Sequence, residues 1–204
     1  TQAKGAYSHA EGYLTWASGA SSHAEGYNTV VYGGQAHAEG GGTIAYGNYS
    51  HAEGSSTQAT GIASHAEGNT SQAIGNYSHA EGYATISSGS WTHAEGRLTI
   101  AYGDWSHAEG FQAESIGQFS HVEGRSTTTN GDYSHAEGHL TIASGSYSHA
   151  EGYGYDAGDA VQGIAYGNYS HVEGALTTAY GEASHAEGYI TTATGDYSHA
   201  EGSN

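Results

Sequence analysis

The sequence predicts an all-β fold, a parallel β-roll or β-solenoid built from 14-residue coils. The motif His-Ala-Glu-Gly or His-Val-Glu-Gly recurs every fourteen residues from His9 to His149, and again from His171 to His199. A short fixed period is the signature of a solenoid. Inside each repeat, small residues alternate with larger or variable ones, and a period of two is that of a β-strand. We therefore expect one repeat domain over residues 1–204, of about 14 coils, with an eight-residue loop insertion at 155–162.

Each repeat is expected to contain two strands and two turns. In the first repeat the five-residue strands would cover residues 8–12 and 15–19, and each ends at a glycine, where the chain must turn. A helix is disfavoured, because two glycines per repeat would destabilise it by about 2 kcal/mol relative to alanine. Stacked coils would lie about 4.8 Å apart, with equivalent strands running parallel.

The alternation predicts which residues are inside the coil. The small residues of both strands are expected to face each other and fill a narrow interior, namely Ser8, Ala10, Gly12, Thr15, Ala17 and Gly19 in the first repeat. His9 and Glu11 then lie on one outer face, and the variable residues of the second strand lie on the opposite face. Val122 and Val172 replace the inner alanine of two repeats, so slightly more bulk is expected there.

Composition argues against several classes of function. The chain has three Lys and Arg against 21 Asp and Glu, and its net charge is −18 with neutral histidines. Nucleic-acid binding is not expected, because phosphate contacts need a basic face. No apolar run approaches eighteen residues, so we expect no membrane insertion by this segment. The chain lacks an initiator Met and starts and stops inside a repeat, so we expect flanking parts elsewhere.

The first half of each repeat resembles a known family of surface fibres. The run Ser8-His9-Ala10-Glu11-Gly12 is similar to the head repeats of trimeric autotransporter adhesins and to related β-roll segments of bacteriophage tail fibres, with His and Glu in place of two aliphatic residues. The resemblance implies a left-handed parallel β-roll, assembled as an intertwined or side-by-side homotrimer. It also implies an extracellular location, on a bacterial cell surface or a virion tail fibre, and a host-surface glycan or protein receptor as partner. The two substituted positions face the trimer centre in that family.

The His and Glu columns are therefore the expected trimer interface. They comprise His9, Glu11, His23, Glu25, His37, Glu39, His51, Glu53, His65, Glu67, His79, Glu81, His93, Glu95, His107, Glu109, His121, Glu123, His135, Glu137, His149, Glu151, His171, Glu173, His185, Glu187, His199 and Glu201. No cofactor is expected, although His and Glu are both metal ligands and a metal-binding solenoid is an open alternative. No enzyme is expected either, because Ser8 and His9 are adjacent on a strand and point to opposite faces.

The candidate ligand-binding residues lie away from these columns. They are Tyr155, Asp156 and Asp159 in the insertion, and Tyr32, Tyr46, Tyr102, Tyr166 and Tyr180 beside the variable strand. A third row of aromatic residues precedes the Ser-His pair in most repeats, and it predicts either a structural ladder or a sugar-stacking strip. The function expected from the sequence is a structural or adhesive segment of a trimeric fibre. The alternative is a purely structural spacer whose binding tip lies elsewhere.

Overall fold

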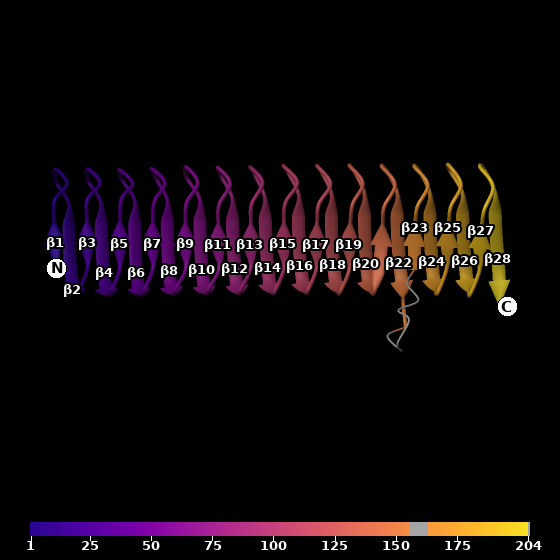
Figure 1. Cartoon of the computed structure of the whole chain (residues 1–204), viewed down its shortest axis with the longest axis horizontal. Helices are drawn as coiled ribbons and strands as arrows, with labels where there is room; N and C mark the ends of the chain where they lie inside the picture. The colour runs from indigo at the N-terminus through magenta and orange to yellow at the C-terminus, as the bar shows by residue number, and fades with distance from the viewer. Residues whose placement is uncertain (156–162, 204) are drawn as a thin grey trace. The chain divides into compact units, whose positions relative to one another are not determined.

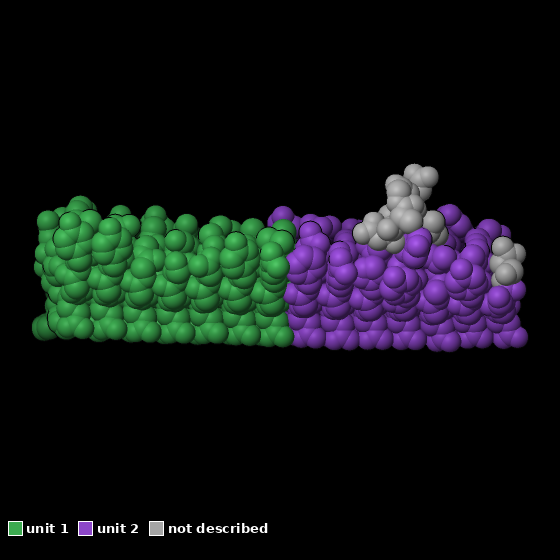
Figure 2. Space-filling view, turned by 90° about the horizontal axis from the view of Figure 1, so that it is seen from below, with its two compact units in different colours: residues 1–101 green, residues 102–204 purple. Residues whose placement is uncertain are grey.

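The computed structural model of the chain describes residues 1–155 and 163–203. The chain is an all-β parallel β-solenoid of about 14 coils, which confirms the predicted fold class (Figure 1). The described residues form no helix, so none of them provides a helix that could cross a membrane. The coils fall into two compact units, residues 1–101 and 102–204, each described by itself below (Figure 2).

Unit 1 alternates five-residue strands with two-residue strands. The long strands are β2 (His9–Tyr13), β4 (His23–Tyr27), β6 (His37–Gly41), β8 (His51–Ser55), β10 (His65–Asn69), β12 (His79–Tyr83) and β14 (His93–Arg97). The short strands are β1 (Gln2–Ala3), β3 (Trp16–Ala17), β5 (Val30–Val31), β7 (Ile44–Ala45), β9 (Gln58–Ala59), β11 (Gln72–Ala73), β13 (Ile86–Ser87) and β15 (Ile100–Ala101). The long strands make one parallel sheet and the short strands the other.

Unit 2 repeats the same alternation. Its long strands are β16 (His107–Phe111), β18 (His121–Arg125), β20 (His135–His139), β22 (His149–Tyr153), β24 (His171–Ala175), β26 (His185–Tyr189) and β28 (His199–Ser203). Its short strands are β17 (Glu114–Ser115), β19 (Thr128–Thr129), β21 (Thr141–Ala143), β23 (Gly163–Ala165), β25 (Thr178–Ala179) and β27 (Thr192–Ala193).

The register joins identical positions of successive coils. His65 pairs with His79, Ala66 with Ala80 and Glu67 with Glu81 in the sheet of long strands. Because the step is one repeat, each side chain lies above its own equivalent, and the sequence period becomes a set of columns along each unit. The two sheets of a unit lie back to back, with their strands running in opposite directions (Figure 1).

The second strand of each coil is shorter than predicted. The backbone N–H groups of Tyr32 and Gly33 both donate to the carbonyl of Ala45, at 2.9 and 3.3 Å. Two donors on one acceptor end the regular ladder, because each parallel-sheet carbonyl normally serves one strand donor. The prediction of a five-residue second strand was therefore wrong, whereas the first strand has five residues and begins one position later than expected, at the histidine.

The interior is filled by small side chains, as the alternation predicts. Ala24, Val31 and Ala38 are fully buried, and so are Thr15 and Thr29. Val122 and Val172 are also fully buried at the two enlarged inner positions. In most coils a buried serine precedes the histidine and donates to a turn carbonyl, as Ser50 Oγ does to Gly47 O at 2.6 Å. A buried hydroxyl with a partner costs little, so these polar residues belong to the core.

The glycines of the two half-repeats differ, and one expectation about them was wrong. Gly33, at the end of the second half, is buried as predicted. Gly26, at the end of the first half, is exposed, lies within β4 with a φ of 108°, and does not fill the interior. A positive φ of this size suits glycine, because other residues place a Cβ against the backbone there.

Two turn positions adopt the left-handed conformation without glycine. Tyr49 has a φ of 61° and Asn28 a φ of 55°, and their equivalents recur in nearly every described coil. Each places its N–H toward the preceding coil: Tyr49 N donates to Gly34 O at 2.9 Å, and Asn28 N donates to Tyr13 O at 2.8 Å. These bonds between coils offset the conformational cost of about 1–2 kcal/mol per residue.

Candidate functional site

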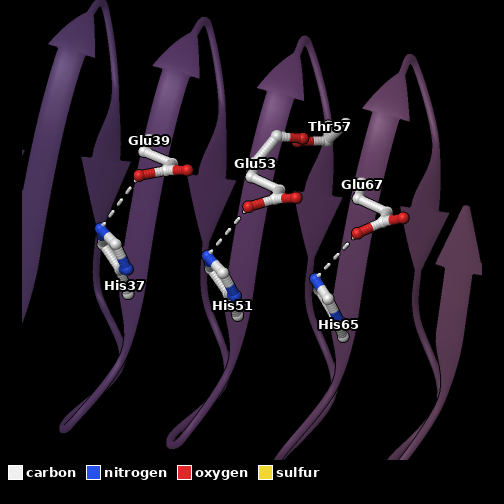
Figure 3. Close-up of polar contacts among 7 residues, drawn as sticks. All are labelled: His37, Glu39, His51, Glu53, Thr57, His65 and Glu67. Atoms are coloured by element: carbon white, nitrogen blue, oxygen red, sulfur yellow. Dashed lines mark hydrogen bonds and ion pairs between the residues drawn. The ribbon is translucent and has the colours of Figure 1, made fainter.

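The candidate site is the double column of histidines and glutamates on the long strands, here called the His/Glu ladder. It comprises the fourteen His-x-Glu pairs of the sequence motif, seven in each unit. Residues two apart on a strand share a face, so every long strand presents one histidine and one glutamate on the same side. Figure 3 shows three successive pairs, His37 with Glu39, His51 with Glu53, and His65 with Glu67.

Within each pair the side chains converge. His79 Nε2 lies 3.5 Å from Glu81 Oε2, and His65 Nε2 lies 3.6 Å from Glu67 Oε2. The corresponding distance in His37–Glu39 is 3.9 Å. About a third of each of these side chains is exposed. The sequence therefore placed both columns on one face correctly, and the structure adds that the histidine contacts the glutamate of its own strand in these pairs.

The histidine rings form a continuous stack in each unit. The ring centroids of His65 and His79 are 4.7 Å apart and their planes differ by 4°. His121 and His135 repeat this arrangement in unit 2, at 4.9 Å and 4°. Because the rings are parallel and in register, their Nε2 atoms point in one direction and form a row beside the row of carboxylates (Figure 3).

The Nε2 atoms of several ladder histidines are withdrawn from solvent. Those of His51, His65, His121 and His135 are buried and have no hydrogen-bond partner. A separation of 3.5–3.9 Å from the carboxylate is longer than a hydrogen bond, which joins nitrogen to oxygen at about 2.7–3.2 Å. Buried polar atoms are normally satisfied, so this row of nitrogen atoms without partners makes the ladder the candidate binding surface.

Crowding shifts the titration of both columns. Burial lowers the pKa of His79, and the charges of His65 and His93 lower it further. Hydrogen bonding to Glu95, followed by desolvation and hydrogen bonding to Glu67, raises the pKa of Glu81 to about 7. The lowered pKa of His79 thus favours its neutral form, and Glu81 keeps a proton near neutrality.

Neighbouring glutamates divide a proton unequally. Hydrogen bonding to Glu123 and Glu151 raises the pKa of Glu137 to about 7. Hydrogen bonding to Glu137 and Glu109 lowers the pKa of Glu123 below its ordinary value. One carboxyl group donates and its neighbour accepts as the ionised form, which reduces the repulsion expected of stacked like charges.

These shifts predict that stability falls as the pH rises above neutrality. The pKa values of Glu81 and Glu137 are raised to about 7, against about 4.3 in an unfolded chain. Their stabilising contribution is therefore fully present below about pH 4.3 and is lost as the pH rises through about 7. The lowered pKa values of His37 and His135 make folding stability rise with pH instead, but this contribution is already complete above about pH 6.5.

Between pH 6.5 and 8.5 the loss of protons from Glu81 and Glu137 therefore sets the sign of the change in folding stability. Thermal unfolding followed by circular dichroism, with a chelator present, should show a melting temperature that falls by a few degrees over this range. The double variant Glu81→Gln, Glu137→Gln cannot lose these protons and should show a shallower fall. A melting temperature that rises with pH in the unsubstituted chain would contradict the assignment.

The tyrosines predicted to bind a ligand lie outside the ladder. Tyr32 stacks on Tyr46 with 5.0 Å between ring centroids, and Tyr166 stacks on Tyr180 at the same distance. Tyr102 is also exposed. All five tyrosines directly follow short strands, so they lie beside the variable residues of the second strand.

The insertion contributes one described candidate. Tyr155 is exposed and lines a shallow, mainly apolar pocket with Tyr153, Leu176 and Tyr189. The sequence singled out Tyr155 but not the other three. Leu176 and Tyr189 belong to neighbouring coils that meet it only in the folded chain. Asp156 and Asp159, also predicted as ligand contacts, lie outside the described residues.

The aromatic row at the turns behaves as a structural ladder. In unit 2, Phe119, Tyr133 and Tyr147 stack with centroids 4.8 Å apart and planes within 5°. Further rings, those of Trp105 and Tyr169, cover the two ends of this trio at 4.8 and 5.1 Å. A sugar needs an open ring face to stack, and both faces of these three rings are covered. The arrangement favours the structural interpretation over the sugar-stacking strip.

No family model matches the chain, and no curated protein matches it.

Proposed function

We propose that the chain is a segment of a trimeric surface fibre, either a bacterial adhesin head or a bacteriophage tail fibre. In this proposal it is extracellular and non-enzymatic, it projects from the surface, and it contributes to binding a host glycan or protein receptor. Its coils are left-handed, and three chains surround one axis with their His/Glu ladders turned inward. The observation that carries the proposal is the contrast between two faces of the solenoid. One is identical in every repeat, and the other varies from coil to coil.

The uniform face supports self-association. A second and third copy in register would meet the same histidine and glutamate at each coil, which suits a symmetric interface. The ladder atoms are partly desolvated on one chain, and Nε2 of His51 and His65 lacks a hydrogen-bond partner there. Carboxylates of a neighbouring chain are suitable partners, and polar contacts of this kind specify register when every member is satisfied.

The variable face supports receptor binding. It carries exposed tyrosines, among them Tyr32, Tyr46, Tyr166 and Tyr180, each about half exposed. Exposed aromatic residues of differing surroundings are typical of contact surfaces, because each ring combines apolar area with a polar hydroxyl.

The arrangement of Ser and His supports a non-enzymatic role. Ser22 Oγ is buried and donates to Gly19 O at 2.7 Å, whereas the adjacent His23 points outward to Glu25. A nucleophile and its base must lie within hydrogen-bond reach, and this geometry separates them.

Molar mass in solution tests the trimer. Light scattering at pH 7.5 should give about three times the 20.9 kDa of one chain. At pH 4 the mass should fall toward one chain, because protonated histidine rings stacked 4.7–4.9 Å apart repel one another. The double variant Glu53→Arg, Glu67→Arg should also dissociate at pH 7.5. Its control, Gln58→Arg with Gln72→Arg, places the same charges on the opposite sheet and should stay trimeric. A folded monomer at pH 7.5 would overturn the proposal.

A purely structural spacer is the second candidate function. The repetition of coils in each unit favours it, since repetition sets a length more directly than it builds one binding site. Binding of this chain alone to host cells would support the adhesive segment. Binding that requires a longer chain would support the spacer.

A further inference from the structure

We propose that the His/Glu ladder binds divalent transition-metal ions of the Zn²⁺ class, each held by two histidines of successive coils and the glutamate between them. In unit 1, ligand atoms of His65, Glu67 and His79 all lie within 4.8 Å of one another. In unit 2, His171, Glu173 and His185 repeat the arrangement. This inference goes beyond the proposed fibre function and does not depend on it, because one chain supplies all three ligands.

The distances suit a shared ion. Zinc binds histidine nitrogen and carboxylate oxygen at about 2.0–2.2 Å, so two ligands at a tetrahedral angle lie roughly 3.3–3.5 Å apart. The ligand atoms of His65, Glu67 and His79 lie within 4.8 Å of one another, so a shared ion would draw His79 inward by up to about 1.5 Å. It would draw His65 and Glu67, whose Nε2 and Oε2 are 3.6 Å apart, together by only a few tenths of an ångström. The same separation is too long for a direct hydrogen bond.

The ligands are held close together before any ion arrives. The rings of His65 and His79 are stacked at 4.7 Å and nearly parallel, so both rings must turn toward the ion for their Nε2 atoms to share it. Pairing of β10 with β12 fixes the separation of their backbones. Both Nε2 atoms are buried and have no hydrogen-bond partner, so metal binding displaces no existing hydrogen bond from them. Preorganised ligands lower the entropic cost of binding.

The donor set selects the kind of ion. Imidazole nitrogen with one carboxylate suits zinc, copper and nickel, whereas calcium and magnesium prefer six or more oxygen ligands. Three protein ligands leave a fourth position for water in a four-coordinate site. The net charge of −18 also favours the approach of cations.

Shared histidines limit the number of ions. His79 belongs both to the group with His65 and Glu67 and to the next group along the chain. Because Nε2 offers one lone pair, His79 can serve only one of them at a time. Seven ladder histidines in each unit, used two per ion, allow three ions per unit and six per chain.

A metal titration of the full, untagged chain tests the proposal. After treatment with chelator and its removal, the chain should bind Zn²⁺ to saturation at six ions, measured by calorimetry and by metal analysis after gel filtration. Co²⁺ should give the visible absorption of a four-coordinate ion, a signal that needs no variant. Binding of fewer than one Zn²⁺ per chain, together with no such absorption, would overturn the proposal.

Two variants locate the ions. Gln at positions 9, 23, 37, 51, 65, 79 and 93 removes the ladder histidines of unit 1 and should halve the bound Zn²⁺. The control is His139→Gln, since His139 is the one histidine outside the motif, and its stoichiometry should be unchanged. Unchanged binding in the first variant, with its circular dichroism preserved, would also overturn the proposal.

Molar mass measured on the same samples separates this inference from the fibre proposal. A trimer without bound metal would refute metal binding and leave the fibre intact. A monomer with six ions would refute the trimer and leave the metal sites intact.

Discussion

Replacing Gly40 with alanine is expected to destabilise unit 1 by more than about 4 kcal/mol, well above the effect of an ordinary substitution. Gly40 lies in β6 and has a φ of 104°, which L-residues rarely adopt. An added Cβ would overlap the carbonyl oxygen of Gly54 in the next coil and lie 3.0 Å from its carbonyl carbon. Both obstacles are backbone atoms, so no side-chain rotation relieves them, and β6 must separate from β8.

Gly41→Ala is the matched control for this substitution. Gly41 is the next residue of the same strand, and a Cβ there would meet nothing within 4 Å. Its φ is not positive, so alanine also restricts the unfolded chain without straining the folded one. We expect a stability equal to that of the unsubstituted chain or slightly higher.

Urea denaturation and amide hydrogen exchange measure the difference. The midpoint of Gly40→Ala should fall markedly, and exchange should accelerate first in β6 and β8, because contacts in a solenoid join only neighbouring coils. Equal midpoints for the Gly40 and Gly41 variants would show that the coils can move apart at little cost, and would contradict the prediction.

The fold was predictable because the same pattern of small and larger residues recurs in every repeat. The fourteen-residue step fixes the parallel register, and the alternation around Ser22, Ala24 and His23 fixes which side chains are inside. The left-handed conformation of Tyr49 was not predictable, since non-glycine residues rarely adopt it and its reason is a hydrogen bond to Gly34 of the preceding coil. The short second strand escaped prediction for the same reason, because it depends on contacts between coils.

The candidate site was predictable as a surface but not as chemistry. Period two places His65 and Glu67 on one face from sequence alone. The separation of 3.6 Å between Nε2 and Oε2 depends on ring orientation, which the stack of histidines sets. The loss of solvent at Nε2 depends on that stack too, and a motif alone does not encode it. Tyr189 beside Tyr155 was missed because the pocket joins residues of different coils.

The second large effect is expected in the interior, at Ala66. Ala66 is fully buried, and its register neighbours Ala52 and Ala80 are equally buried. The two sheets are so close that hydroxyl groups cross the gap directly: in unit 2, Ser115 Oγ and Ser120 Oγ are 2.6 Å apart. Ala66→Leu adds three carbons to this space and should destabilise unit 1 by about 3 kcal/mol, at the upper end of the usual cost of overpacking.

Ala66→Val is the control, because another coil already has valine at the equivalent position. Val122 occupies the equivalent position in β18, fully buried between Ala108 and Ala136 of the adjoining strands. A β-branched residue also fits a strand well. We therefore expect Ala66→Val to change stability by less than about 1 kcal/mol.

Urea midpoints followed by circular dichroism should thus separate the leucine variant from the valine variant. Urea midpoints equal to that of the unsubstituted chain in both variants would show that the interior has room for a larger side chain. That result would contradict the close packing indicated by the contact between hydroxyl groups. An equal and large loss of stability in both variants would show that unit 2 accommodates Val122 by a local adjustment that unit 1 does not make.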